Sequence, residues 1–248
     1  MALIDPALVR YVDLLLLDAG NCVIFLDHAR LARLSTAAGF AIDAATLVRT
    51  EGEAKLAHER GELTGVAWAG SHLPGARGWG EMMATMLHRA GFPLERVPAF
   101  LSALWVEHVA TNTYSVVPAG FAAAMDRVHA AGVKVAIVSN SEGMLQKLFG
   151  DLGILRHFDR VVDSGIVGVT KPDPRIFRIA LEHFGLGADR ALMLGDTYAT
   201  DIVGARAAGI RAALIDPFAH MEGRHRDVPR VPGVVEVAEA IAGARARG

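Results

Sequence analysis

Five polar side chains that suit phosphate chemistry follow short apolar stretches of this chain of 248 residues. They are Asp18, Ser139, Lys171, Asp196 and Asp201. Three carboxylates brought together would repel one another, and a single lysine cannot neutralise them. A hard divalent cation such as Mg²⁺ could, because it binds carboxylates together with water and phosphate oxygens. A carboxylate can also act as a nucleophile toward phosphorus. The residue types therefore predict phosphoryl transfer.

A parallel sheet would bring these side chains together. Apolar runs rich in Val, Ile and Leu alternate with helical patterns, which indicates an α/β fold with a Rossmann-like parallel sheet. Ligands of such sheets gather beyond the carboxyl ends of the strands, where the five polar residues lie. The predicted strands are Val12 to Leu17, Val133 to Val138, Arg160 to Val162, Ala191 to Leu194 and Arg211 to Ile215.

Helical patterns fill the intervals between these strands. Glycines at positions 132, 185 and 209 stand where helices should end. The predicted helices are Gly120 to Ala131, Met144 to Leu152, Pro174 to Phe184, Asp201 to Ala208 and, near the C-terminus, Val234 to Arg245.

The interval between the first two strands is too long for one crossover connection. It predicts an inserted helical domain over residues 27–112, with the α/β core formed by residues 1–26 and 113–248. Helical periodicity is visible in His28 to Ala38, Ala44 to Arg60, Glu81 to Arg89 and Val97 to Val109.

Composition favours a small-molecule partner. The 25 Lys and Arg against 27 Asp and Glu give a formal charge of −2, without the basic patch of a nucleic-acid-binding protein. No membrane span and no signal-peptide pattern is visible. The single cysteine, Cys22, is expected to be a buried small residue and agrees with a reducing, cytoplasmic location. Both a monomer and a homodimer are compatible with the sequence.

Four motifs of this chain resemble those of the haloacid dehalogenase-like hydrolase superfamily, in the branch with a helical cap inserted after the first motif. In chain order they are "LLLLDAGNCV", "VAIVSNSEG", "TKPDPRIF" and "LGDTYATDIVGARAAG". The last two are the most specific. The resemblance extends over nearly the whole chain and implies an α/β core with a cap domain.

The resemblance also implies a role for each motif residue. Asp18 would be the nucleophile and a metal ligand, and Ser139 would hydrogen-bond the phosphoryl group with Asn140 beside it at the substrate. Lys171 would neutralise charge between nucleophile and substrate. Asp196 would bind Mg²⁺, with Asp201 close by as a further metal residue.

The first motif departs from the family pattern at Gly20. Phosphatases of this family usually read Asp-x-Asp-Gly-Thr-Leu, and their second Asp protonates the leaving oxygen and later activates water. Gly20 has no side chain for this task, although its backbone carbonyl can keep the metal contact made at this position. General acid–base help is typically worth about 10²–10⁴-fold, so a slow phosphatase is expected. Asp27 is a candidate substitute for the missing acid, but it is expected to start the linker to the cap.

Two other functions stay open. The dehalogenases of the family also lack the second Asp, since a halide leaves without a proton, but they usually lack the metal-binding acid that stands here at Asp196. A phospho-ligand-binding protein with weakened catalysis is the other alternative.

The glycine-rich stretch "HLPGARGWGEM" is expected to be a loop of the cap. In the resembling family such a loop selects the substrate, which makes His72, Arg77 and Trp79 candidate substrate-binding residues. Asp173 and Pro174 have a structural explanation as the cap and first residue of a helix.

Overall fold

A computed structural model describes residues 4–73 and 75–246 and separates them into two compact units. The core unit contains the chain up to Phe25 and from Val117 onward, and the helical unit contains Leu26–Val116. These limits lie near the predicted boundaries at residues 27 and 112. The assignment of the helical unit as a cap domain remains a prediction.

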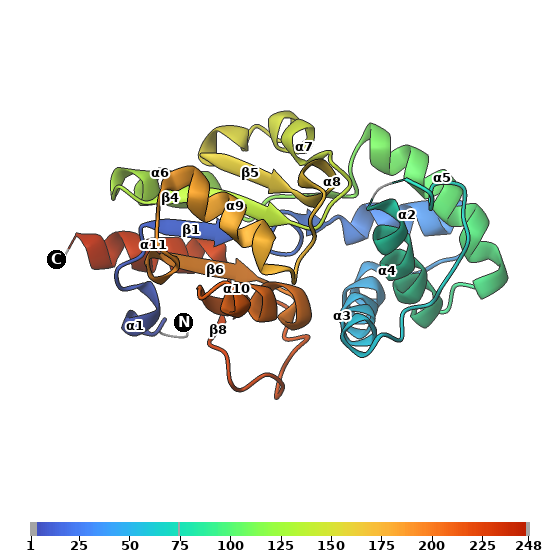
Figure 1. Cartoon of the computed structure of the whole chain (residues 1–248). Coiled ribbons are helices and arrows are strands. Elements are labelled where there is room, and N and C mark those ends of the chain that lie inside the picture. The colour runs from blue at the N-terminus through green and yellow to red at the C-terminus, as the bar shows by residue number, and fades with distance from the viewer. Residues whose placement is uncertain (1–3, 74, 247–248) are drawn as a thin grey trace. The chain divides into compact units, whose positions relative to one another are not determined.

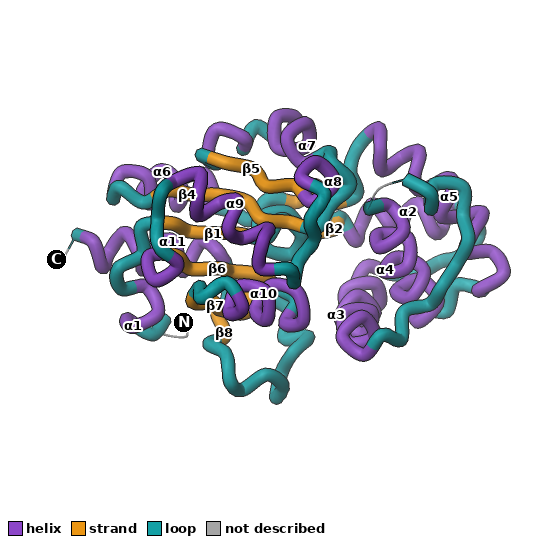
Figure 2. The backbone as a smooth tube through the Cα atoms, in the orientation of Figure 1, coloured by secondary structure: helices purple, strands orange, loops and turns teal. Residues whose placement is uncertain are grey.

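The core unit is built on a parallel sheet of six strands in the order β5-β4-β1-β6-β7-β8 (Figure 2). Every side chain of the central strand β1 is buried, as expected for a parallel strand covered on both faces. This architecture confirms the predicted α/β fold. The strands are β1 (Leu14–Leu17), β4 (Lys134–Ser139), β5 (Arg160–Asp163), β6 (Ala191–Gly195), β7 (Arg211–Ile215) and β8 (Arg230–Val231).

Helices cover both faces of this sheet (Figure 1). Helices α6 and α11 pack against each other, as do α9 and α10. Asp173 caps α9 through its side chain and Pro174 is the first helical residue, as predicted. The helices of the core unit are α1 (Pro6–Val9), α6 (Phe121–Ala130), α7 (Leu145–Asp151), α8 (Ser164–Val167), α9 (Pro174–Phe184), α10 (Val203–Ala207) and α11 (Val234–Arg245).

Most predicted boundaries in the core unit agree with the structure to within one residue, and two differ by more. The first strand begins at Leu14 rather than Val12. Tyr11, just before the predicted start, has a left-handed backbone with φ 59°, so the extended chain cannot begin before Val12. The helix expected from Asp201 begins earlier, as a π-helical turn over Tyr198–Ile202 that continues into α10. Single π-helical turns of this kind are frequent at functional sites.

The helical unit buries a core of its own. A cluster of buried apolar side chains takes Leu47, Met83, Leu87 and Leu101 from three helices and Phe92 from a loop between two of them. The helices are α2 (His28–Ala37), α3 (Ala44–Arg60), α4 (Ala76–Arg89) and α5 (Val97–Ala110), with a 3₁₀ turn over Leu94–Arg96. Short strands β2 (Phe25–Leu26) and β3 (Tyr114–Val116), at the ends of this segment, pair with each other.

The prediction that "HLPGARGWGEM" forms a loop is wrong for its second half, since α4 begins at Ala76 instead of Glu81. Gly75, with φ 73°, starts the helix, and Gly80 lies inside it. A Cβ at Gly80 would lie 2.7 Å from Cε2 of Trp68. This glycine therefore makes room for an indole ring and does not break the helix. Pro74 lies outside the described residues.

Among the helices that the structure describes, none combines the length and the apolar character needed to cross a lipid bilayer.

Candidate active site

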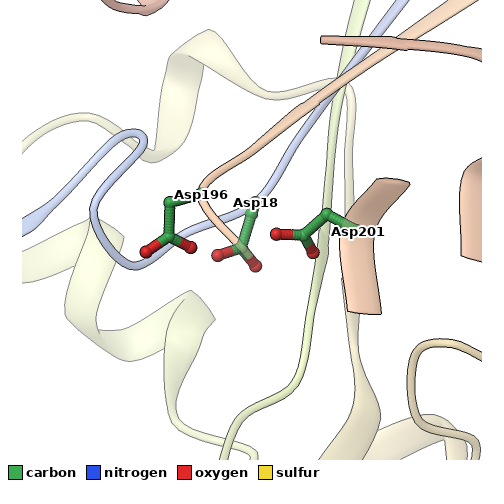
Figure 3. Close-up of side chains that lie close together, drawn as sticks. All are labelled: Asp18, Asp196 and Asp201. Atoms are coloured by element: carbon green, nitrogen blue, oxygen red, sulfur yellow. The ribbon is translucent and has the colours of Figure 1, made fainter. Parts of the chain in front are cut away.

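Three buried aspartates meet at the carboxyl edge of the sheet (Figure 3). Asp18 follows β1, Asp196 follows β6, and Asp201 lies in the π-helical turn that comes next. Each offers one carboxylate oxygen, and these oxygens all lie within 4.8 Å of one another. Asp18 lies between the other two in the close-up. The adjacency of β1 and β6 in the sheet explains why residues so distant in sequence converge.

Lys171 joins two of these carboxylates. Its Nζ donates to Oδ1 of Asp18 at 2.6 Å and to Oδ1 of Asp201 at 2.6 Å. The ammonium group is buried with both partners, so the hydrogen bonds are charge-assisted and shielded from water. The structure thus brings together four of the five predicted chemical residues by direct geometry.

The pKa values of Lys171 and Asp201 are both raised in this cluster. Burial opposes the charged form of Lys171, but Asp18 and Asp201 outweigh it and raise the pKa of the ammonium group. Burial also raises the pKa of Asp201, with Lys171 opposing this shift and Asp18 and Asp196 adding to it. One lysine therefore leaves the three carboxylates undercompensated.

Gly195 allows Asp201 to reach this position. A Cβ on Gly195 would press on the Cγ and Oδ2 atoms of Asp201 and lie 2.5 Å from its Cβ. The second oxygen of Asp201 accepts a hydrogen bond from the backbone N–H of Thr197 at 2.9 Å. The Thr197 hydroxyl donates to Asp196 at 3.2 Å. Sequence reasoning did not single out Gly195 or Thr197, although both stand inside the fourth motif.

Asn140 holds the backbone of Lys171. The Asn140 Nδ2 donates to the Lys171 carbonyl at 3.0 Å, and Lys171 N–H donates to Asn140 Oδ1 at 2.7 Å. The predicted substrate contact of Asn140 remains a prediction, and this second task was not foreseen. Gly204 packs closely against the residue after Lys171, since a Cβ there would lie 2.9 Å from the carbonyl oxygen of Pro172.

Ser139 is the buried last residue of β4, beside β1 in the sheet. The loop that follows is fastened by Asp163, whose carboxylate accepts from the N–H groups of Gly143, Leu145 and Gly165 at 2.9–3.2 Å. Sequence reasoning missed Asp163, the last residue of β5, whose carboxylate binds these backbone groups. Its position fixes the segment that carries Ser139.

The loop after Asp18 turns back on itself. Ala19 accepts hydrogen bonds from the N–H groups of Val23 and Ile24, and Asn21 N–H donates to Ile24. Asn21 has φ 53°, a left-handed conformation that asparagine tolerates, so it replaces the glycine of the family pattern. Gly20 is partly exposed and is not among the residues with positive φ. Its backbone therefore allows a side chain.

Cys22 is buried, as predicted, and its thiol contacts the carbonyl oxygen of Leu194 at 3.6 Å. Burial raises the pKa of this thiol, and the charges of Asp18 and Asp196 add to the shift. The thiol is thus held in its neutral form. Asp27 caps α2 by accepting from the N–H of Arg30, a structural role that agrees with its expected place at the start of the linker.

The three candidate substrate residues of the helical unit have different environments. His72 and Arg77 are exposed, and Arg77 pairs with Glu81 one helical turn away at 2.9 Å. Trp79 is buried among aromatic rings, 5.2 Å from Trp105 between ring centres. None of the three is among the residues that the core unit brings together. Their contact with substrate remains a prediction.

A hard divalent cation fits the donor set of the carboxylate cluster. Neighbouring ligands of Mg²⁺ at the usual 2.0–2.1 Å are about 3 Å apart, and opposite ligands about 4 Å apart. Oxygens within 4.8 Å can therefore reach one ion with a shift of less than about 1 Å. Both oxygens of Asp201 already accept hydrogen bonds, so Asp18 and Asp196 are the direct ligands that the geometry favours.

The fold, the strand-end nucleophile candidate and the lysine between two acids define a class of hydrolase. Residues 27–209 match the family model of the haloacid dehalogenase-like hydrolases, which is most of the chain. The chain belongs to this family.

Curated relatives include phosphatases. Phosphoserine phosphatase of Thermus thermophilus is 37% identical over 152 residues, 60% of this chain and 57% of the relative. Glyceraldehyde 3-phosphate phosphatase of Methanothermobacter thermautotrophicus is 34% identical over 118 residues, 44% of this chain and 52% of the relative. The chain spans about half the length of the curated relatives it matches.

Solved structures confirm the fold over almost the whole chain. The putative hydrolase YfnB of Bacillus subtilis superposes with a TM-score of 0.62 and 19% identity, covering 93% of this chain and 98% of YfnB. L-2-haloacid dehalogenase of Xanthobacter autotrophicus gives a TM-score of 0.59 at 18% identity, covering 94% of this chain and 99% of the dehalogenase. At these sequence identities the similarity shows the shared fold, and the reaction has to be inferred from the residues of the site.

Proposed function

We propose that the protein is a Mg²⁺-dependent phosphatase that hydrolyses a small phosphorylated metabolite through an aspartyl-phosphate at Asp18. The observation that carries this proposal is the Asp18 carboxylate, bound by Lys171 and lying beside Asp196. A dehalogenase needs the nucleophile and the lysine. The additional buried acid, Asp196, supports a site for a cation.

In the first step, a carboxylate oxygen of Asp18 attacks phosphorus and the bond to the leaving oxygen breaks. Lys171 holds the Asp18 carboxylate in place through its hydrogen bond, and Ser139 donates a hydrogen bond to the transferring group. In the second step, the oxygen of a water molecule attacks phosphorus, the Asp18–phosphate bond breaks, and inorganic phosphate leaves. Bound Mg²⁺ would supply positive charge to the phosphate oxygens, held by Asp18, Asp196 and the Gly20 carbonyl.

The proton needed by the leaving oxygen has no donor at position 20. We infer that this enzyme works slowly on alkyl phosphates and faster on aryl phosphates, whose leaving oxygens need little protonation. Water attack in the second step lacks the same group. The aspartyl-phosphate is therefore expected to accumulate when the first step is fast.

The substrate class follows from the relatives' names, phosphoserine phosphatase and glyceraldehyde 3-phosphate phosphatase, both of which act on small phosphorylated molecules. His72, Arg77 and Trp79 are the proposed residues of the helical unit that select the substrate, with Asn140 at the core. We place the enzyme in the cytoplasm, as a monomer or a homodimer.

The test is a hydrolysis screen of phosphorylated metabolites, p-nitrophenyl phosphate and 2-chloropropionate, with and without Mg²⁺. We expect phosphate release that requires the metal and is lost in Asp18→Asn. Asp196→Asn should weaken Mg²⁺ binding and turnover together. Asp216→Asn is the matched control, since Asp216 also follows a strand but binds the N–H groups of His220 and Met221.

Full phosphatase activity in excess chelator would contradict the metal assignment. Halide release without metal would favour the dehalogenase alternative, which the missing acid at Gly20 supports. Tight binding of phosphorylated compounds without turnover would favour the binding-protein alternative.

A further inference from the structure

A cavity lies in the core unit at the opposite end of the sheet from the carboxylates. Its volume is about 470 Å³, within the size range of small-molecule sites. Helix α1, at the amino ends of the strands in Figure 1, forms one wall. The lining residues are Pro6, Ala7, Arg10, Tyr11, Asp189, Arg190 and Arg211.

Positive charge exceeds negative charge around this cavity. Arg190 is paired with Asp13 at 2.5 Å, but the guanidinium of Arg211 donates to neutral backbone carbonyls, among them those of Leu8 and Arg10. The Arg10 guanidinium lies 4.6 Å from the centre of the Tyr11 ring. Within the described chain, neither Arg10 nor Arg211 forms an ion pair with a carboxylate.

The surroundings of Arg211 oppose the positive charge of its guanidinium group. Burial lowers the pKa of its guanidinium, with Asp189 opposing the shift and the charge of Arg190 adding to it. A lowered pKa means that the protein environment disfavours the cation. An anion in the cavity would relieve this cost, because it would give the guanidinium groups a counter-charge.

Tyr11 supplies a flat surface at the same place. Its side chain is 57% exposed, and its backbone has φ 59°, which is unfavourable for a bulky residue. Arg10 and Arg190 both lie within cation–π distance of the ring. A strained, exposed aromatic ring among arginines contributes little to the folded core. Backbone strain of this kind is frequent at ligand-binding sites.

We propose that this cavity is a binding site for a small phosphorylated molecule with a planar ring, of which a nucleoside monophosphate is the simplest example. The phosphate would be bound by Arg10 and Arg211, because guanidinium groups match phosphate oxygens in geometry and charge. The planar ring would lie against Tyr11. The site is separate from the carboxylate site and does not depend on the proposed reaction.

The test is two-dimensional NMR of the full chain titrated with adenosine 5′-monophosphate, with phosphorus NMR confirming that the nucleotide stays intact. We expect shifts of the backbone amides of Ala7, Tyr11 and Arg190. Inorganic phosphate and adenosine serve as separate probes of the charge and the ring, and each should bind at least about tenfold more weakly than the nucleotide.

Two variants locate the contacts. Arg10→Gln and Tyr11→Gly should each weaken nucleotide binding at least about fivefold. The matched control is Arg96→Gln, since Arg96 lies 4.5 Å from the centre of the Phe40 ring in a similar cation–π contact in the helical unit. Tyr11→Gly should keep the wild-type Tm or raise it, because glycine adopts the left-handed backbone without strain.

Shifts confined to the surroundings of Asp18 would overturn the proposal, as would equal affinity in Arg10→Gln and the wild type. Phosphate binding as tightly as the nucleotide would overturn the assignment of the ring to Tyr11. A Tm of Tyr11→Gly more than about 4 °C below the wild type would show that the ring is structural.

Discussion

Replacing Gly195 with alanine tests whether the position of Asp201 controls turnover. The added Cβ would lie 2.5 Å from the Cβ of Asp201 and closer still to its carboxylate. Carbon atoms normally stay about 3.5 Å apart, so Asp201 must move by about 1 Å. Gly195 is in β6, whose four other residues are buried apolar ones, and the strand cannot shift in compensation.

The size of the effect follows from the hydrogen bonds that this movement breaks. Asp201 would lose its 2.6 Å contact with Lys171 and its bond from Thr197. Lys171 would then be hydrogen-bonded to Asp18 alone, and its ammonium group would move from its present position. A misplacement of about 1 Å can cost about 10²-fold in rate. Breaking a buried ion pair costs about 3–5 kcal/mol of folding free energy when one partner is left uncompensated.

The assay is steady-state hydrolysis of an aryl phosphate, with Tm measured on the same preparation. We expect kcat to fall about 100-fold and Tm to fall. The matched control is Gly187→Ala, where the added Cβ would also meet a carboxylate, at 2.5 Å from Oδ1 of Asp189. That aspartate is exposed and can turn away. A folded Gly195→Ala protein with kcat within twofold of the control would refute the reasoning.

Three further predictions concern other parts of the chain. Gly20→Asp should raise turnover of alkyl phosphates by about 10-fold or more, because it restores an acid that is typically worth 10²–10⁴-fold; rapid-quench kinetics should also show a smaller burst. Gly80→Ala should destabilise the protein by about 1–3 kcal/mol in urea unfolding, because its Cβ would overlap the Trp68 ring. Gly78→Ala in the same helix should stabilise it by up to about 1 kcal/mol, since no atom lies within 4 Å. Burial lowers the pKa of His108 from 6.5 to about 4. Since the unfolded chain then binds the extra proton, His108 should make folding about 2 kcal/mol less favourable at pH 5 than at pH 7. Urea midpoints at the two pH values check this, and His108→Gln should remove most of the difference.

Each of these predictions has a contrary outcome. A Gly20→Asp enzyme no faster than the wild type, together with no burst in the wild type, would show that the missing acid does not limit turnover. Equal unfolding midpoints for Gly80→Ala and Gly78→Ala would show that Trp68 accommodates the extra methyl group. The same pH dependence in His108→Gln and the wild type would assign the loss to other groups.

The sequence predicted the sheet and its carboxyl edge because parallel central strands are short apolar runs, and such runs are visible in one dimension. Asp18 and Asp196 could be placed for that reason, each by the strand before it. The contact between Lys171 and Asp201 could not, because it depends on a close approach over Gly195 that no periodicity encodes. The same holds for Asn140, whose side chain binds a backbone segment 31 residues away in sequence.

The start of α4 shows why a glycine in the sequence does not always mark the end of a helix. Gly75 does mark the helix start, but Gly80 serves the packing of Trp68 within the helix. The sequence contains no local signal that separates these two uses. Tyr11 is the opposite case, since an aromatic residue takes the left-handed conformation where a glycine would be expected.

The burial of Cys22 makes this protein convenient for spectroscopy. Its one cysteine is 1% exposed and held as a neutral thiol, so maleimide reagents should not react with it. Cysteines introduced at Ile166 in the core unit and Val106 in the helical unit, which are 72% and 68% exposed, would be the only reactive thiols. A donor and acceptor dye at these two sites would report the distance between the units in solution, molecule by molecule, as phosphate and metal are added.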